Sequence, residues 1–203
     1  MDKELIIKGE LVSEKPLLIM VHGRGATANN ILSLADHLSV ENFTLIAPQA
    51  QNHTWYPYSF MAPLQQNQPS LDNALGWLNE ILKKAKNLGI ENERIFFLGF
   101  SQGACLTLEF AARNAKKYGG IIAFTGGLIG NKITLENYNG NFNGTKIYIG
   151  TSDPDPHVPL GRVKETETVL KQMCAEVDVD VFPGMGHTIV QDEIDKAIRI
   201  LNP

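Results

Sequence analysis

The residues with the clearest chemistry are Gly99–Gly103, which read Gly-Phe-Ser-Gln-Gly. The apolar run 95–98 precedes them and an amphipathic segment follows from Gln102, so Ser101 is expected in a tight turn from a strand to a helix. Such a turn holds the serine side chain clear of the sheet, and a Cβ on either glycine would collide with neighbouring backbone. The context predicts a nucleophilic serine. The alternative is a serine that only caps the helix.

A serine hydroxyl is a poor nucleophile unless a base removes its proton. Of the five histidines, His187 is the preferred base, because it lies in a glycine-rich loop after the last expected strand and comes last in the order serine, acid, histidine. The others fit less well. His22 helps shape the turn after a strand, His37 lies on an expected helix, His53 lies in an aromatic loop, and His157 stands between two prolines.

The base needs a carboxylate to orient it, and two candidates follow the expected strand 146–149. Asp153 and Asp155 stand two residues apart in the sequence from Gly150 to Pro159. The prolines around Asp155 make a rigid turn that can hold a carboxylate towards the base, which favours Asp155. Asp153 would then be an Asx-turn residue or an acceptor behind the site, although it stays open as the acid.

Acyl transfer also needs N–H donors for the developing oxyanion. The main chain of Gln102, at a helix N-terminus, supplies one, and the loop that begins His22-Gly-Arg-Gly supplies the other, for which we expect the N–H of Arg24. The Arg24 side chain is either a sensor for a substrate anion or a plain surface arginine. The dinucleotide pattern GxGxxG is excluded here because Ala28 occupies its last position.

Residues 50–68 form an expected long ordered loop that is rich in aromatic residues. Trp55, Tyr56 and Phe60 are the candidates for a substrate-binding wall around an apolar group. The alternative is that these side chains only pack the loop onto the domain.

The elements that must position these residues alternate between short apolar runs and longer amphipathic ones, which predicts an α/β fold with a mostly parallel sheet and helices on both faces. Expected strands are 5–11, 17–21, 43–46, 95–98, 120–124, 146–149 and 178–182. Expected helices are 29–38, 70–88, 102–115, 160–174 and 188–201. A second loop is expected at 126–145. The candidate residues then follow the carboxyl ends of strands, where open α/β sheets bind ligands.

The length of 203 residues predicts one domain over residues 1–203. Of these residues 43% are hydrophobic, and the net charge is −4. The sequence has no cluster of Lys and Arg, so neither nucleic acid nor an anionic membrane surface is expected as a partner. It also has no segment typical of a signal peptide or of membrane insertion. Cys105 and Cys174 form neither a disulfide framework nor a metal motif, so no metal or cofactor is expected. The default location is cytoplasmic.

Four segments, His22-Gly-Arg-Gly, Gly99-Phe-Ser-Gln-Gly, Asp155-Pro-His-Val-Pro and Gly184-Met-Gly-His, resemble the signatures of the phospholipase/carboxylesterase family of α/β-hydrolases, which includes the acyl-protein thioesterases. The resemblance spans about residues 16–201 in order. It implies an α/β-hydrolase fold. A core of five or six strands with their helices uses nearly all 203 residues, so the cap is expected to be minimal or absent. The resemblance also implies Ser101 as nucleophile, Asp155 as acid, His187 as base, and the amides of Arg24 and Gln102 as the oxyanion hole. The spacing from the strand-end glycine would instead select Asp153.

Together these observations predict a serine hydrolase that cleaves carboxylic esters through an acyl-enzyme, with a small-molecule ester as substrate and a homodimer as one possible assembly. A lysophospholipase or acyl-protein thioesterase is the nearest alternative. A non-catalytic ligand-binding module on the same fold is the alternative from another class, since fold alone does not fix function.

Overall fold

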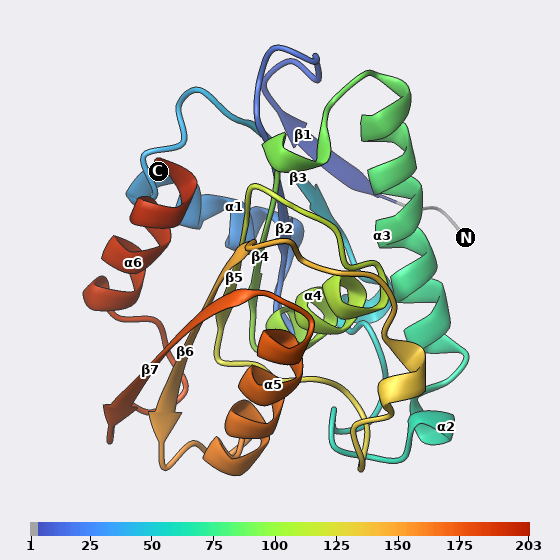
Figure 1. Ribbon diagram of the computed structural model, residues 1–203, viewed down its shortest axis with the longest axis vertical. Helices are drawn as coiled ribbons and strands as arrows, with labels where there is room; N and C mark the ends of the chain where they lie inside the picture. Colours follow the sequence, from blue (N-terminus) through green and yellow to red (C-terminus); the bar gives the residue numbers. More distant parts are fainter. Residues whose placement is uncertain (1–3) are drawn as a thin grey trace.

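Seven strands form one sheet in the computed structural model, which describes residues 4–203 (Figure 1). The strand order is β1-β3-β2-β4-β5-β6-β7, and every neighbouring pair is parallel except β1 with β3. The strands are β1 Leu5–Lys8, β2 Leu17–Val21, β3 Thr44–Pro48, β4 Ile95–Phe100, β5 Gly120–Phe124, β6 Lys146–Asp153 and β7 Glu176–Pro183.

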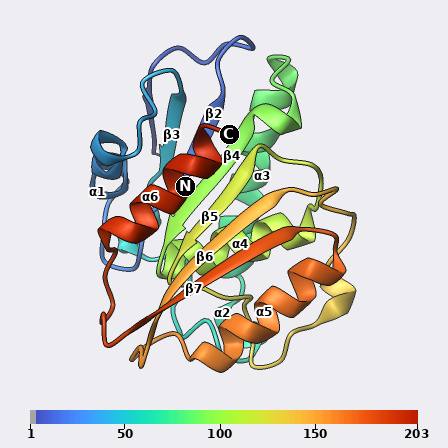
Figure 2. The same ribbon diagram turned by 60° about the vertical axis from the view of Figure 1, so that its left-hand side comes forward.

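Helices cover both faces of this sheet. Helices α1 and α6 lie on one face, and α3, α4 and α5 lie on the other (Figures 1 and 2). The α-helices are α1 Ala28–Leu32, α2 Leu64–Asn67, α3 Ser70–Asn87, α4 Gln102–Arg113, α5 Leu160–Gln172 and α6 Gln191–Leu201, and 3₁₀ turns occupy Ser33–His37, Gln51–His53, Asn92–Arg94 and Leu135–Asn137. The predicted mostly parallel sheet with helices on both faces is confirmed.

The two faces explain why the central strands are apolar throughout. Every residue of β2, β3 and β5 is buried. Because helices pack on both sides, alternate side chains of one strand enter two different cores, so a continuous apolar run is stable where an alternating one would bury polar groups. In β2, for example, Ile19 belongs to the core under α3 and α4, and Met20 to the core under α1 and α6.

Several element ends differ from the sequence predictions for local reasons. The first strand stops at Lys8 rather than residue 11, because Gly9 adopts a left-handed φ of 89°. The first helix stops at Leu32 and tightens into a 3₁₀ turn, where the Ser33 hydroxyl donates to the carbonyl of Asn30. Strand β6 continues to Asp153, because β7 pairs with it along its whole length.

The loop expected at 126–145 is held by buried charged side chains, with one 3₁₀ turn inside it. The carboxylate of Glu109, on α4, accepts hydrogen bonds from the main-chain N–H of Ile129 and the hydroxyl of Tyr138. From α5, the Arg162 guanidinium donates to the carbonyls of Leu128 and Gly130. These contacts satisfy the polar main chain of a segment that has no ladder partner for most of its length.

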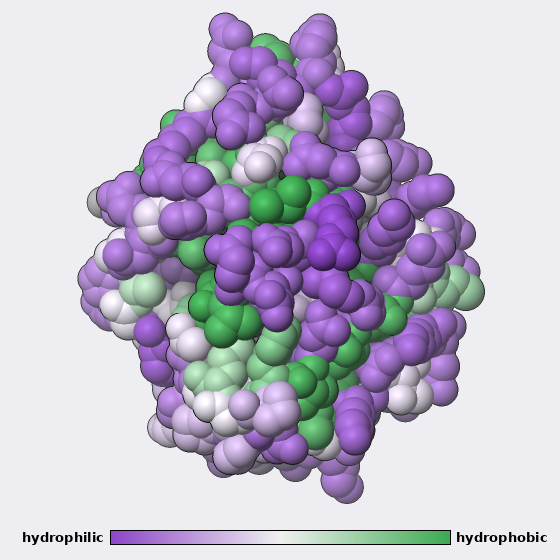
Figure 3. Space-filling model, turned by 90° about the vertical axis from the view of Figure 1, so that its left-hand side faces the viewer, coloured by the Kyte–Doolittle hydropathy of each residue, from purple (hydrophilic) through white to green (hydrophobic). Residues whose placement is uncertain are grey.

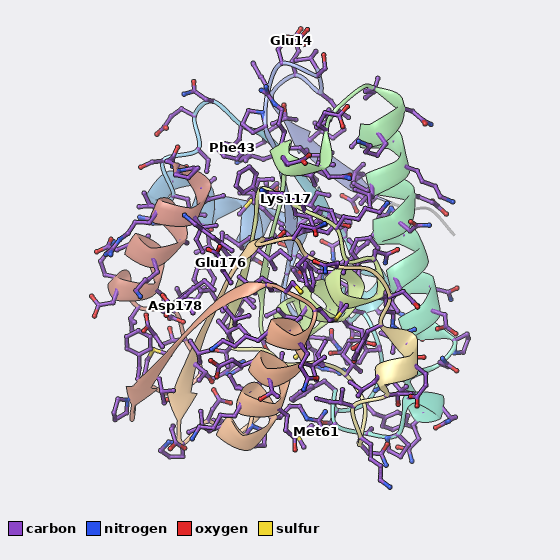
Figure 4. All side chains as sticks on the ribbon, viewed as in Figure 1. Glu14, Phe43, Met61, Lys117, Glu176 and Asp178 are labelled. Atoms are coloured by element: carbon purple, nitrogen blue, oxygen red, sulfur yellow. The ribbon has the colours of Figure 1, made fainter. Side chains whose placement is uncertain are left out.

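The carboxyl ends of β6 and β7 point to the end of the molecule where Met61, from the aromatic loop, also lies, whereas Glu14 lies at the opposite end (Figure 4). The loops that follow the parallel strands therefore gather with residues 50–68 at one edge of the sheet. That edge is the expected ligand-binding edge of an open α/β sheet.

Strand β7 forms one margin of the sheet, and acidic residues such as Glu176 and Asp178 lie along it (Figure 4). Asp178 pairs with Lys196 of α6 at 2.6 Å. Seen from the side where α6 and β7 lie, hydrophobic residues appear in strips that hydrophilic residues interrupt (Figure 3). Charges on a free strand edge oppose edge-to-edge association.

Within residues 4–203, no helix combines the length and apolar character that crossing a membrane needs.

A buried carboxylate, that of Glu193, lies where α6 meets β6. A Cβ on Gly150 would come within 1.9 Å of its Oε1, so only glycine leaves room for this side chain. Its Oε2 accepts the N–H of Val190 at 2.9 Å, and its Oε1 has no partner. Burial raises the pKa of Glu193 to about 7, and the nearby Asp180 carboxylate adds to the effect.

This raised pKa predicts a pH-dependent stability. Between about 4.5 and about 7 the folded protein holds a proton on Glu193 that the unfolded chain releases, so the free energy of unfolding falls as pH rises through this window. Glu193→Gln keeps an acceptor for Val190 and removes the titration. We expect its stability relative to wild type to rise between about pH 5 and about pH 8, by up to about 3 kcal/mol in urea unfolding.

Asp192→Asn is the matched control, since it removes an exposed carboxylate from the same turn of α6. Its stability relative to wild type should hardly change with pH. Equal pH dependence of Glu193→Gln and Asp192→Asn would contradict the assignment.

Candidate active site

Ser101 occupies the turn between β4 and α4 with φ 55° and ψ −119°, a conformation that is costly for a residue with a side chain. The flanking glycines make the turn possible. A Cβ on Gly103 would lie 2.1 Å from the carbonyl oxygen of Val21, and one on Gly99 would lie 2.4 Å from the carbonyl oxygen of Gly103. Strand, helix and neighbouring strand are therefore packed backbone to backbone around the serine.

Three side chains from separate loops form a continuous hydrogen-bonded chain. The Oγ of Ser101 lies 2.8 Å from Nε2 of His187, and Nδ1 of His187 lies 2.8 Å from Oδ2 of Asp155. A carboxylate can only accept, so Nδ1 of His187 carries the proton, which leaves Nε2 free to accept from the serine hydroxyl.

The turn after β6 positions Asp155. Its Oδ1 accepts the main-chain N–H groups of His157 and Val158 at 2.7 and 2.8 Å, as in an Asx-turn. Burial on its own would raise the pKa of Asp155, but the hydrogen bonds from His187 and from the two main-chain N–H groups outweigh it and lower that pKa. The carboxylate therefore stays ionised. The other candidate acid, Asp153, is exposed at the end of β6, opposite Pro183 of β7.

One serine that the sequence analysis did not single out joins the loops of the acid and the base. The hydroxyl of buried Ser152 accepts the N–H of Gly186 at 3.1 Å and donates to the carbonyl of Pro154 at 3.3 Å. Gly186 precedes His187, and Pro154 precedes Asp155. The sequence gave no signal for this role of Ser152, because a serine near the end of a strand has no pattern that indicates a link between two loops.

The two predicted oxyanion donors lie on loops that meet at Ser101. In the turns, loops and helix caps of residues 4–203, neither the main-chain N–H of Gln102 nor that of Arg24 donates to a main-chain carbonyl. Gly23, next to Arg24, packs closely on the serine, since a Cβ there would lie 3.5 Å from the Ser101 Cβ. Both N–H groups are thus available to an anionic oxygen bound beside the serine.

The Gln102 side chain has a structural role that sequence reasoning missed. Its Oε1 accepts the N–H of Trp55 at 2.9 Å, and its Nε2 donates to the carbonyl of Tyr56 at 2.8 Å. Gln102 is 6% exposed, so these contacts satisfy buried main-chain groups of the aromatic loop. The residue after the serine therefore fixes the loop that faces it.

A cavity of about 430 Å³ opens beside the serine. Of the three predicted substrate-binding aromatics, Tyr56 and Phe60 line it. Trp55 does not, contrary to the prediction: its ring packs 4.9 Å from that of His22 and its Nε1 donates to the His22 carbonyl. Trp55 lines a separate cavity of about 340 Å³ next to α3.

The Arg24 side chain is neither free nor a plain surface group. Its Nη2 donates to the carbonyls of Tyr56 and Tyr58 at 2.9 and 2.7 Å, and its Nη1 donates to that of Pro57 at 2.9 Å. The guanidinium thus holds the tip of the aromatic loop, and it also lines the cavity. Residues 50–68 form a long connection between β3 and α3, as expected, but they contain the 3₁₀ turn 51–53 and helix α2.

The remaining histidines separate into structural and cavity-lining groups. His22 is buried, its Nδ1 donates to the Gly23 carbonyl, and its Nε2 accepts the N–H of Ala50, so it holds the turn as predicted. Burial also lowers the pKa of His22. His157, dismissed in the sequence analysis, lines the cavity, with its ring 4.9 Å from that of His187. The only sequence signal for His157 was its place two residues after Asp155.

No group of three or more metal-ligating side chains occurs among residues 4–203. Cys105 also lines the cavity, one helical turn after Ser101, but burial raises its pKa to about 12. It therefore stays a neutral thiol, unsuited to nucleophilic attack.

This fold and this arrangement define the α/β-hydrolase class. The family model described as phospholipase/carboxylesterase matches residues 1–202, and the chain belongs to that family. It is a carboxylic ester hydrolase.

Individual proteins agree with this assignment. The crystal structure of a phospholipase/carboxylesterase from Dyadobacter fermentans is 51% identical in sequence and covers 99% of this chain and 97% of its own, with a TM-score of 0.96. Acyl-protein thioesterase 1 from Saccharomyces cerevisiae is 28% identical over 94% of this chain and 93% of its own. The Bacillus cereus carboxylesterase structure, at 18% identity and a TM-score of 0.79 over 99% of this chain and 94% of its own, shows the shared fold.

The contacts of the Gln102 side chain predict a stability effect. Gln102→Ala leaves the buried N–H of Trp55 without an acceptor and removes one of the three donors to the Tyr56 carbonyl, so we expect a loss of about 1 to 3 kcal/mol in the free energy of unfolding. Urea unfolding measures it, and limited proteolysis should show new cleavage within residues 50–68. Gln65→Ala, at an exposed glutamine of α2, is the control and should be nearly neutral. Equal stability of the two variants would contradict the role given to Gln102.

Proposed function

We propose that this enzyme cleaves carboxylic esters through an acyl-enzyme on Ser101, with His187 as general base and acid and Asp155 as its orienting carboxylate. The observation that carries the proposal is the unbroken hydrogen-bonded chain Ser101–His187–Asp155, with 2.8 Å at each link. Such a geometry lets the serine lose its proton as its oxygen attacks a carbonyl carbon.

In the first half of the reaction, Nε2 of His187 takes the proton of Ser101 while Oγ bonds to the ester carbon. Negative charge develops on the carbonyl oxygen, and the main-chain N–H groups of Arg24 and Gln102 stabilise it. The tetrahedral intermediate collapses when His187 gives the proton to the leaving alcohol oxygen. Asp155 stays ionised throughout and stabilises the histidine cation.

In the second half, His187 takes a proton from water, whose oxygen attacks the acyl carbon. The acid is released and Ser101 regains its proton. Tyr56 and Phe60 are proposed to contact the apolar part of the substrate, since both line the cavity beside the serine. His157 and Val158 line the same cavity from the acid's loop.

Thioester or lysophospholipid cleavage is the second candidate. It is favoured by the curated relative named acyl-protein thioesterase 1, which aligns over most of this chain. The same residues would attack a thioester carbonyl, so the chemistry does not separate the two. A series of acyl esters and thioesters of increasing chain length does, because a preference for long chains would favour the second candidate.

The remaining parts of the proposal concern the protein as a whole. We propose that residues 1–203 act as one domain and that the protein works in the cytoplasm. We also propose that it can assemble as a homodimer. The two free thiols, buried Cys105 and exposed Cys174, suit a reducing compartment. A non-catalytic binding module is disfavoured, because such a protein would not need Ser101, His187 and Asp155 in hydrogen-bonded register.

The role of Ser101 predicts the effect of removing its oxygen. Ser101→Ala should lower kcat for a short para-nitrophenyl ester by about 10⁴- to 10⁶-fold, because no other group can form the acyl-enzyme. Ser33→Ala, at an exposed serine that directly follows α1, is the control and should keep wild-type activity. A loss of only a few-fold in Ser101→Ala would overturn the mechanism.

The two candidate acids make a matched pair. Asp155→Asn should reduce kcat by about 10⁴-fold, because the amide cannot hold His187 in the same tautomer or stabilise its cation. Asp153→Asn changes an exposed carboxylate at the end of β6 and should change kcat by less than about threefold. Steady-state kinetics on one ester measures both, and the opposite pattern would reassign the acid to Asp153.

A further inference from the structure

The cavity beside Ser101 carries positive charge in a protein whose net charge is negative. The chain has 22 Asp and Glu residues against 18 Lys and Arg, yet no carboxylate lines the cavity, whereas a guanidinium and two imidazoles do. The guanidinium is that of Arg24, and the imidazoles are those of His157 and His187. Asp155 lies behind His187, and its side chain is fully buried. A cavity of this polarity favours a negatively charged ligand over a positively charged one.

The guanidinium is held in a fixed place. Its hydrogen bonds to the carbonyls of Tyr56, Pro57 and Tyr58 use three of the five N–H donors that an arginine has. Two donors remain, and the residue is exposed at the cavity. Because the side chain is already ordered, an anion that binds it causes little further loss of conformational freedom.

The same residue faces the reaction from both its main chain and its side chain. Its N–H is the proposed oxyanion donor, and its guanidinium stands on the same cavity as Ser101 and His157. A group bound by the guanidinium would therefore share the cavity with the ester that Ser101 attacks. The three carbonyl contacts explain why the loop is ordered, but they do not explain why the cavity lacks every acidic side chain.

We propose that the natural substrate is an ester that carries a second, anionic group, a carboxylate or a phosphate, and that Arg24 selects it. This inference rests on the proposed ester hydrolysis at Ser101 and names its substrate class. The anion stays unchanged in the reaction: only the ester bond is cleaved. His157 lines the same cavity from the acid's loop.

The test compares esters that differ in charge but hardly in shape. One pair is monoethyl adipate and the ethyl ester of adipic acid monoamide, which places the charge on the acyl part. The other pair is the acetate esters of para-hydroxybenzoate and para-hydroxybenzamide, which places it on the leaving alcohol. The acetate ester of para-hydroxyphenyl phosphate extends the second pair and separates phosphate from carboxylate. The readout is the ratio of kcat/KM for the charged and the neutral ester.

The variants separate the charge of Arg24 from its hold on the loop. In Arg24→Gln the ratio should fall about five- to tenfold for at least one pair, as expected for loss of a partly exposed ion pair. In Arg24→Lys most of the ratio should remain, although kcat/KM for both esters falls because lysine cannot reach three carbonyls at once. Added salt should lower the ratio in wild type and leave Arg24→Gln unchanged.

The outcomes distinguish this inference from the function on which it rests. If wild type hydrolyses the neutral esters and Arg24→Gln leaves the ratio unchanged in both pairs, Arg24 does not select an anion, and ester hydrolysis at Ser101 still stands. If wild type hydrolyses none of these esters, both proposals fail. A ratio that falls equally in Arg24→Lys and Arg24→Gln would also overturn the inference, because loop damage rather than charge would explain it.

Discussion

The close approach of α4 to the ends of β2 and β4 is the constraint on which the rest of the site depends. At Gly103 the helix backbone lies so near the carbonyl of Val21 that any side chain would push the elements apart. That contact sets the turn at Ser101 and aims its Oγ away from the sheet. It also places the N-terminus of α4 beside the loop of Arg24, so the two proposed oxyanion donors depend on the same packing.

The other site loops are fixed by polar contacts as well as by apolar packing. The paired extension of β6 and β7 carries the acid and the base to the same edge of the sheet, and Ser152 joins their loops. On the opposite wall, the side chains of Gln102 and Arg24 bind the main chain of the aromatic loop. These contacts satisfy main-chain groups in segments that have no ladder partners, which is why irregular segments can form a defined cavity.

The sequence predicted the sheet, the helices and the residues that meet at the site, because apolar periodicity and the glycines around Ser101 leave few alternatives. It could not predict the use of a side chain by distant main-chain groups. Gln102 was expected to act through its N–H alone, Trp55 was expected in the cavity, His157 was considered only as a base and set aside, and Ser152 was not singled out. Such roles depend on where loops far apart in the chain cross, and no local pattern records that.

The central claim is that Ser101 becomes covalently acylated while His187 activates it. Mass spectrometry of the protein after brief reaction with a slowly hydrolysed aryl ester tests it most directly. The account predicts an added acyl mass on the peptide that contains Ser101, which decays as product appears and does not form in His187→Ala. Hydrolysis without any acyl mass on Ser101, or acylation of another residue at the rate of turnover, would contradict it.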